Sequence, residues 1–156
     1  MYNTSLRIVN DPAEAEDIMQ EAFLEAFRQL GSYAGEGSFG SWLKRIVINR
    51  SLDFLRKERE TVSIDETGFD LPEPMEEITE EDILLRVEEV KKAMAKLPDD
   101  YRVILSLFLL EGYDHEEISK ILNISNQLSR TRYSRARQKL LGMLSANSLT
   151  NAFSHN

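Results

Sequence analysis

The residues best suited to chemistry in this chain are arginines and lysines gathered towards its carboxyl end. From Ile118 onward there is no Asp or Glu, and the formally charged side chains are Lys120, Arg130, Arg132, Arg135, Arg137 and Lys139. The whole chain has a net charge of −8, so this basic segment stands apart from an acidic background. Guanidinium and ammonium groups bind phosphate oxygens, and arginine also pairs with the major-groove edge of guanine. The pattern therefore indicates binding of nucleic acid.

Residues 114–144 carry the local signals of a helix-turn-helix that would position these cations. Asp114 and Glu117 form a capping-box pattern at the start of a short helix. Asn123 tolerates the left-handed conformation of a tight turn, and Ser125 is a good cap for the next helix. The apolar side of that next helix would comprise Tyr133, Ala136, Leu140 and Leu144, and its polar side Gln127, Arg130, Thr131, Ser134 and Arg135. The alternative to a DNA-contacting helix is a surface helix whose basic face is simply solvated. The succession of a cap, a turn and a second cap, together with charge of one sign, favours DNA contact.

A second basic concentration lies in residues 44–59. It comprises Lys44, Arg45, Arg50, Arg56, Lys57 and Arg59, opposed only by Asp53 and Glu58. Directly upstream is the glycine-rich and aromatic stretch GSYAGEGSFGSWL. Aromatic rings beside a basic helix can stack on unpaired bases while the cations follow the phosphates. Trp42 falls at core spacing, which favours burial for its ring, whereas Phe39 at the edge of the loop suits either role.

Helical spacing of apolar residues predicts an all-α chain with two small domains joined by an acidic linker. Apolar stripes before and after the loop at 31–38 comprise Ile18, Ala22, Phe23, Ala26, Phe27 and Leu30, and then Phe39, Trp42, Leu43, Ile46 and Val47. Residues 60–89 contain twelve acids against one base and include two prolines, so we expect residues 60–81 to form a flexible linker. The helical pattern then continues over residues 82–144, with residues 101–110 interpreted as a helix rather than a buried strand. Residues 145–156 form a polar tail.

Several other classes of protein are excluded or disfavoured. Without cysteine, the chain can form neither a disulfide nor a thiolate metal site. It lacks the apolar run of ~20 residues that spans a membrane and the features of a signal peptide, so we expect a cytoplasmic protein. His115 stands beside Asp114, Glu116 and Glu117 but has no second histidine at helical spacing. We therefore expect no metal site, no cofactor and no catalytic residue. The acidic helix at 11–27 would repel DNA and suits a basic protein partner.

Two blocks of the sequence resemble bacterial RNA polymerase sigma factors of the extracytoplasmic-function group, which contain only regions 2 and 4. The block similar to region 2 is AEDIMQEAFLEAFRQLGSYAGEGSFGSWLKRIVINRSLDFLRK, within residues 1–59. The block similar to region 4 is KAMAKLPDDYRVILSLFLLEGYDHEEISKILNISNQLSRTRYSRARQKL. The blocks stand in the family's order with a variable linker between them. The resemblance implies a non-enzymatic subunit that binds core RNA polymerase and directs promoter recognition and DNA melting.

The resemblance also implies roles for individual residues. For docking on the beta-prime clamp helices of the polymerase it points to Asp17, Gln20 and Glu21. For the minus-ten element it points to Ser38 and Phe39 around an extruded base, with Arg45, Asn49, Arg50, Arg56 and Lys57 on backbone and bases. For the minus-thirty-five element it points to Gln127, Arg130, Arg132 and Arg135. The polymerase beta flap and an anti-sigma factor are the further partners that it implies.

The chain departs from the family pattern in two places. It begins partway through the family's first helix, so residues 1–9 resemble the end of that helix. The recognition helix opens with Gln127-Leu128-Ser129 where the family has Gly-Thr-Val, and we expect Ser129 to face the core. Two other interpretations stay open: a stand-alone helix-turn-helix regulator that binds duplex DNA without polymerase, and a sigma-like module that binds polymerase or an anti-sigma factor without supporting initiation.

Overall fold

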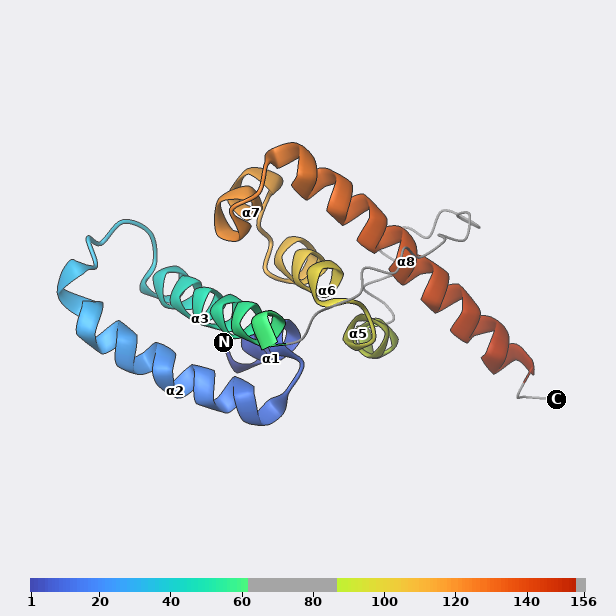
Figure 1. The fold of residues 1–156 in the computed structure, drawn as a ribbon, viewed down its shortest axis with the longest axis horizontal. Helices are drawn as coiled ribbons and strands as arrows, with labels where there is room; N and C mark the ends of the chain where they lie inside the picture. Colours follow the sequence, from blue (N-terminus) through green and yellow to red (C-terminus); the bar gives the residue numbers. More distant parts are fainter. Residues whose placement is uncertain (62–86, 154–156) are drawn as a thin grey trace. The chain divides into compact units, whose positions relative to one another are not determined.

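The computed structural model describes residues 1–61 and 87–153, and all the regular secondary structure in those ranges is helical. The chain divides into two compact units, Met1–Glu66 and Thr67–Asn156, whose helices are labelled in Figure 1. The predicted all-α fold with two helical domains is confirmed. The acidic linker predicted at 60–81 lies outside the described residues, apart from its first two positions at the end of a helix.

The first unit consists of three helices that all contact one another: α1 (Tyr2–Val9), α2 (Pro12–Gln29) and α3 (Phe39–Thr61). The turn between α1 and α2 is made by Asn10, whose φ of 59° is left-handed. Asp11 then caps α2, because its carboxylate accepts the backbone N–H groups of Ala13 at 2.9 Å and Glu14 at 3.2 Å. Helix α2 therefore begins where a short polar side chain can satisfy its free amides.

The core of this unit is formed by small residues of α2 packed against larger ones of α1 and α3. Its buried apolar members are Ile8, Val9, Ala15, Ile18, Ala22, Ala26, Leu43, Val47, Ile48, Leu52 and Leu55. The apolar stripe predicted on α2 was wrong in part, because Phe23, Phe27 and Leu30 are 45%, 74% and 50% exposed. Helices α1 and α3 cover only the alanine side of α2, and the larger residues lie beyond that contact.

One hydrogen bond between two serines crosses this core. The hydroxyls of Ser5 on α1 and Ser51 on α3 lie 2.9 Å apart, and both residues are fully buried. Ser51 donates its proton to the carbonyl of Val47 at 2.8 Å, so Ser5 must be the donor between the two hydroxyls. Because unpaired buried hydroxyls are costly, this pair favours one register of α1 against α3.

The described part of the second unit, residues 87–153, contains α5 (Val87–Ala95), α6 (Asp99–Leu105), α7 (His115–Leu122) and α8 (Asn126–Phe153). Helix α6 continues as a π-helical turn over Ser106–Leu110, which confirms helix rather than strand for this stretch. Helices α5, α6 and α7 all contact α8, and α8 extends past Leu144 into the predicted polar tail. The buried apolar residues of this unit are Val90, Ala93, Met94, Leu97, Val103, Ile104, Leu105, Leu107, Ile118, Ile121, Ala136, Leu140 and Leu144.

The helix-turn-helix signals read from the sequence are confirmed at the junction of α7 and α8. Asp114 accepts the Glu117 amide at 2.8 Å, and the Glu117 carboxylate accepts the Asp114 amide, which completes the capping box. Asn123 is left-handed with φ 54°. Ser125 accepts the Leu128 amide at 3.0 Å and so caps the start of α8. Local chemistry therefore sets both ends of the turn.

A cluster of side chains around His115 joins α7 to α8, and the sequence did not reveal it. The Nδ1 atom of His115 lies 2.9 Å from the hydroxyl of Ser129. Its ring stacks on Phe108 with centroids 4.8 Å apart and meets Tyr133 edge-on at 5.5 Å. The pKa of His115 is lowered by burial and then by the charge of Arg130, while Asp114 acts in the opposite direction. Burial between the two helices therefore favours the neutral form of the ring.

A buried arginine stabilises the turn between α5 and α6. Arg102 is 4% exposed, and its guanidinium donates to the Leu97 carbonyl at 3.2 Å and to the Asp99 carboxylate at 2.6 Å. Its own carbonyl accepts the Ser106 hydroxyl at 2.7 Å. This arginine therefore holds the start of α6 and is not available to DNA.

Replacing Arg102 should destabilise the second unit. In Arg102→Ala, the buried carbonyl of Leu97 loses a donor, so we expect the free energy of unfolding to fall by about 2 kcal/mol. Chemical denaturation followed by circular dichroism measures the change. Lys92→Ala, which removes an exposed cation from α5, is the matched control and should change stability by less than about 0.5 kcal/mol. Equal effects of the two substitutions would contradict a structural role for Arg102.

The lowered pKa of His115 predicts a loss of stability in mild acid. The unfolded chain binds a proton near the ordinary pKa of 6.5, before the folded protein does, so the free energy of unfolding decreases as the pH falls through that value. The loss ends once the pH is below the folded pKa. Denaturation at a series of pH values from about 7.5 to 5.5 should show a weaker pH dependence for His115→Gln than for the wild type. Parallel curves for the two proteins would refute this expectation.

Candidate nucleic-acid and polymerase interface

The outer face of α2 begins acidic and becomes apolar. Asp17, Gln20 and Glu21 are all exposed, on the side of the helix opposite its buried alanines. Leu24 and Phe27 continue the same face at helical spacing, with exposures of 56% and 74%. The three predicted polymerase-contacting residues therefore lie together, and two large apolar residues that the sequence analysis did not assign to this surface extend it.

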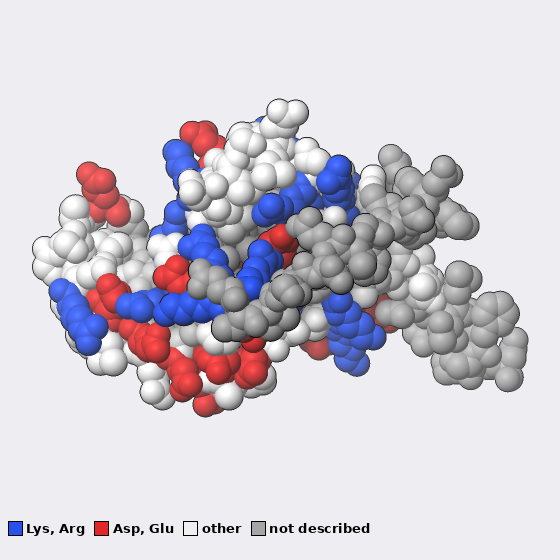
Figure 2. All heavy atoms as spheres, in the orientation of Figure 1, with Lys and Arg blue, Asp and Glu red and all other residues white. Residues whose placement is uncertain are grey.

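Helix α3 presents its basic residues in two rows. Arg45, Asn49 and Arg56 follow one another at spacings of four and seven, while Arg50 and Lys57 are seven apart. Asn49, Arg56 and Lys57 are exposed, and Arg45 and Arg50 are half-buried. Figure 2 shows acidic side chains gathered over α2 and basic ones beside them over α3. Five of the seven residues predicted for the minus-ten element therefore lie at least partly exposed along one helix.

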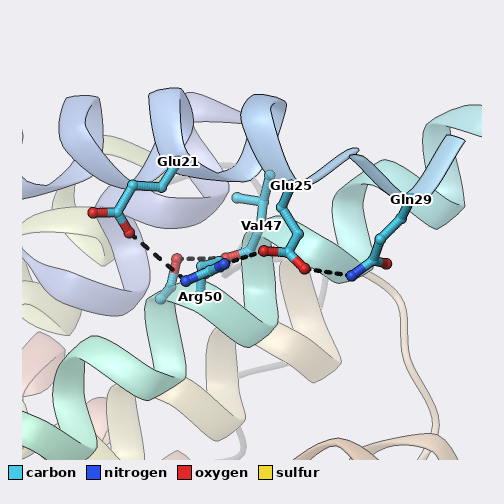
Figure 3. A network of polar contacts seen from close by, with 6 residues as sticks. Glu21, Glu25, Gln29, Val47 and Arg50 are labelled. Carbon is cyan, nitrogen blue, oxygen red and sulfur yellow. Dashed lines mark hydrogen bonds and ion pairs between the residues drawn. The ribbon is translucent and has the colours of Figure 1, made fainter. Parts of the chain in front are cut away.

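Two of these arginines already have carboxylate partners. Arg56 lies 3.2 Å from Asp53 in an exposed pair on the same helix. Arg50 reaches across to α2, where it donates to Glu25 and lies 4.0 Å from Glu21 (Figure 3). The pKa of Glu25 is lowered chiefly by its hydrogen bond from Arg50. Arg50 is thus the point where the acidic and basic helices meet.

The loop between α2 and α3 holds a cluster of three aromatic rings. Tyr33, Phe39 and Trp42 have ring centroids 5.3 to 5.8 Å apart, and Phe39 is 47% exposed. The Tyr33 hydroxyl donates to the Gly37 carbonyl at 2.7 Å, and this hydrogen bond joins the two ends of the loop. Trp42 is half-buried in this cluster rather than part of the closed core expected from its spacing.

Ser38 has a structural role at the start of α3. Its hydroxyl oxygen accepts the Ser41 amide at 3.1 Å and lies 2.8 Å from the Ser41 hydroxyl. Together with the positive φ of Gly35 and Gly37, this cap sets the direction in which the loop enters the helix. Phe39, the next residue, is thereby placed at the exposed edge of the aromatic cluster.

The structure determines how the recognition helix α8 is rotated. Ser129, Ala136 and Leu140 are fully buried, which confirms the expectation that Ser129 faces the core. The exposed side of the helix comprises Gln127, Leu128, Arg130, Thr131, Ser134, Arg135 and Gln138. Arg132 is half-buried beside the core. Of the four residues predicted for the minus-thirty-five element, Gln127, Arg130 and Arg135 are therefore open to a ligand, and Arg132 lies on the flank.

Arg130 is oriented by a neighbour one turn earlier. Its Nε donates to the side-chain oxygen of Asn126 at 2.8 Å, and the residue is exposed. A guanidinium held at Nε presents a preformed pair of donors, the arrangement that suits the O6 and N7 atoms of guanine. Asn126 was not among the residues that the sequence singled out.

Two other kinds of site were sought in the described ranges, residues 1–61 and 87–153. No three His, Asp or Glu side chains there are grouped closely enough to hold a metal ion. No helix there has the length and apolarity needed to cross a membrane.

Comparison with known proteins gives the same division of the chain. Residues 1–61 match the family model for sigma-70 region 2, and residues 87–140 match that for sigma-70 region 4. The RNA polymerase sigma-H factor of Pseudomonas aeruginosa is 32% identical over 145 residues, which cover 86% of this chain and 75% of that protein. The ECF RNA polymerase sigma-E factor of Escherichia coli is 29% identical over 137 residues, covering 81% and 72% respectively.

Two solved structures have a similar fold. One is the sigma factor RpoE of Bartonella quintana in complex with the anti-sigma factor NepR, with a TM-score of 0.64 at 21% identity over 92% of this chain and 89% of that one. The other is CnrH in complex with the cytosolic domain of CnrY, with a TM-score of 0.58 at 22% identity over 93% and 80%.

The matched regions, the identity to curated sigma factors and the helical fold lead to one conclusion. The chain belongs to the sigma-70 family, as a sigma factor of the extracytoplasmic-function type with regions 2 and 4, and it is a non-enzymatic initiation subunit whose partners are core RNA polymerase and promoter DNA.

Proposed function

We propose that the first domain, residues 1–59, joins the polymerase to the minus-ten element through two neighbouring helices. Asp17, Gln20 and Glu21 on α2 contact the basic side of the beta-prime clamp helices, and Leu24 and Phe27 add apolar contact. The basic residues of α3 contact DNA. The observation that carries this proposal is the separation of opposite charges onto adjacent helices of one unit (Figure 2), since each helix then attracts one partner and repels the other.

For melting, we propose that the aromatic loop receives an unstacked base of the minus-ten element. Phe39 stacks on the base, Tyr33 and Trp42 support its ring, and Ser38 holds the loop against α3. Arg45, Asn49, Arg50, Arg56 and Lys57 follow the adjoining backbone and bases. Opening a base step costs a few kcal/mol, which stacking on an aromatic platform and phosphate contacts offset without any catalytic group.

For the minus-thirty-five element, we propose that α8 enters the major groove with its first turns nearest the bases. Gln127 and Arg130 lie there on the exposed side, so they read base edges, as recognition helices do with their amino-terminal residues. Arg135 lies further along the same exposed side, and Arg132, on the flank, contacts phosphate. The second domain, residues 82–144 with the polar residues 145–156 after it, also contacts the polymerase beta flap.

We propose three features of the setting. Both similar solved structures are complexes, one with an anti-sigma factor and one with the cytosolic domain of CnrY, so an anti-sigma factor is the third partner that we assign to this chain. A subunit that works with polymerase on promoter DNA acts in the cytoplasm. The acidic segment at 60–81 serves as the linker that lets the two domains reach separate promoter elements.

The decisive experiment is run-off transcription of sheared genomic DNA by purified core polymerase, with and without this protein. We expect new 5′ ends that share two spaced upstream motifs, because the two DNA-binding domains read separate elements. Sites bound without polymerase, and no new starts, would favour a stand-alone regulator. Binding to polymerase without new starts would favour an interaction module that does not support initiation.

A substitution in the recognition helix tests the base-reading role. Arg130→Ala should cost about 1–3 kcal/mol of discrimination at one base pair of the minus-thirty-five element, because a bidentate contact to one base is lost. Competition binding with single-position variants of the promoter found by run-off mapping measures it. Lys92→Ala removes the same charge from α5 and should leave discrimination unchanged. Uniform weakening across all sequences would instead identify Arg130 as a phosphate contact.

A further inference from the structure

Among the basic residues proposed for the minus-ten element, Arg50 differs in being joined to an acidic residue of the polymerase-facing helix. We infer that Glu25 withholds Arg50 from DNA in the free protein, so that the Glu25–Arg50 pair must open before Arg50 can contact a promoter phosphate. This inference rests on the proposed role of α3 in DNA binding and adds Glu25 as a residue that controls it. The pair joins positions 25 residues apart, on separate helices.

The geometry shows a carboxylate that is itself held in place. One oxygen of Glu25 accepts from Arg50, and the other accepts from the side-chain amide of Gln29 one turn later (Figure 3). The Glu25 side chain is 24% exposed and that of Arg50 36%. Because Glu25 is oriented by Gln29 and partly shielded from water, it is a stronger competitor for the guanidinium than a freely rotating surface glutamate.

The charges around Arg50 also oppose an incoming phosphate. Besides Glu25, the carboxylate of Glu21 lies 4.0 Å from the guanidinium. The Arg50 guanidinium therefore lies beside two carboxylates that repel an approaching phosphate, while the charge of Arg28 also acts on Glu25. By contrast, Asn49 and Lys57 on the same helix are exposed. Arg50 is thus a site on α3 where an acidic helix competes directly with DNA.

The position of Glu21 connects this competition to polymerase binding. Glu21 belongs to the surface proposed to contact the clamp helices, and its side chain is 63% exposed. A basic partner that pairs with Glu21 removes one of the two negative charges near Arg50 and so favours opening of the remaining pair. By thermodynamic linkage, if polymerase binding raises the affinity of α3 for DNA, DNA binding raises the affinity for polymerase by the same factor.

The test measures binding of the full chain to a fluorescein-labelled oligothymidylate by anisotropy at several salt concentrations, without polymerase. Glu25→Gln should bind more tightly than the wild type, with a steeper salt dependence. Each added phosphate contact on a single strand changes the log–log slope by about 0.7, so the advantage should shrink about 2.6-fold between roughly 50 and 200 mM salt. Glu25→Ala serves as a second variant, since a glutamine can still accept from Arg50. Denaturation of each variant establishes that it is folded.

A matched control separates this effect from net charge. Glu16→Gln alters the charge of α2 by the same amount at an exposed position on the same helix. We expect it to raise the DNA affinity less, and its effect measures the contribution of net charge alone. In addition, Arg50→Gln should weaken binding more in the Glu25→Gln background than in the wild type, because Arg50 is available only in the former.

Three outcomes would overturn the inference. If Glu25→Gln binds no better than Glu16→Gln, Glu25 does not compete with DNA. If Glu25→Gln binds more weakly than the wild type, Glu25 instead orients Arg50 towards DNA. If Arg45→Gln changes binding in neither background, α3 is not a DNA-binding surface at all, and the proposed function of this helix fails together with the inference. If Arg45→Gln still weakens DNA binding but Glu25→Gln has no effect on it, the inference fails while the proposed function of α3 stands.

Discussion

The close contact between α2 and α3 is the constraint on which the first domain depends. Alanines on α2 pack against branched side chains on α3, which lets two helices of opposite charge lie side by side in one small unit. Because the interior side of α2 is built from small residues, its large apolar residues remain at the surface, next to the acidic ones. The same contact brings Glu25 to Arg50. The surfaces proposed for polymerase binding and for DNA binding therefore lie on one packed pair of helices.

In the second domain, the buried face of α8 determines in the same way which residues remain at the surface. Ser129, Ala136 and Leu140 are buried against the preceding helices, and the hydrogen bond between His115 and Ser129 joins the two helices of the DNA-binding motif. With that side of α8 covered, the opposite side must carry Gln127, Arg130 and Arg135. The side of α8 on which these arginines lie thus follows from the residues that are buried on the opposite side.

Neither domain needs a reactive group for the role of a sigma factor. In the proposed mechanism of promoter opening, contacts to aromatic rings and cations replace base stacking. The free energy of these contacts offsets the cost of unstacking, so no catalytic group is needed. The acidic face on α2 suits a basic partner protein, and under the proposed Glu25–Arg50 competition it also limits binding of DNA by the unassembled subunit. Net negative charge and DNA binding are compatible because the two signs are kept on separate helices.

The sequence by itself determined the features that depend on neighbouring residues: the caps of α7 and α8, the left-handed Asn123, the sign of charge on each helix, the all-α class and the sigma-family resemblance. These follow from local hydrogen bonding, helical periodicity and recurring motifs, which a chain displays before it folds. Tertiary structure decided which side of each helix is covered, and so left Phe23 and Phe27 exposed on α2 and Arg132 on the flank of α8. It also decided that Arg50 pairs with Glu25 and His115 with Ser129, because partners far apart in sequence meet only once packing sets the rotation of their helices.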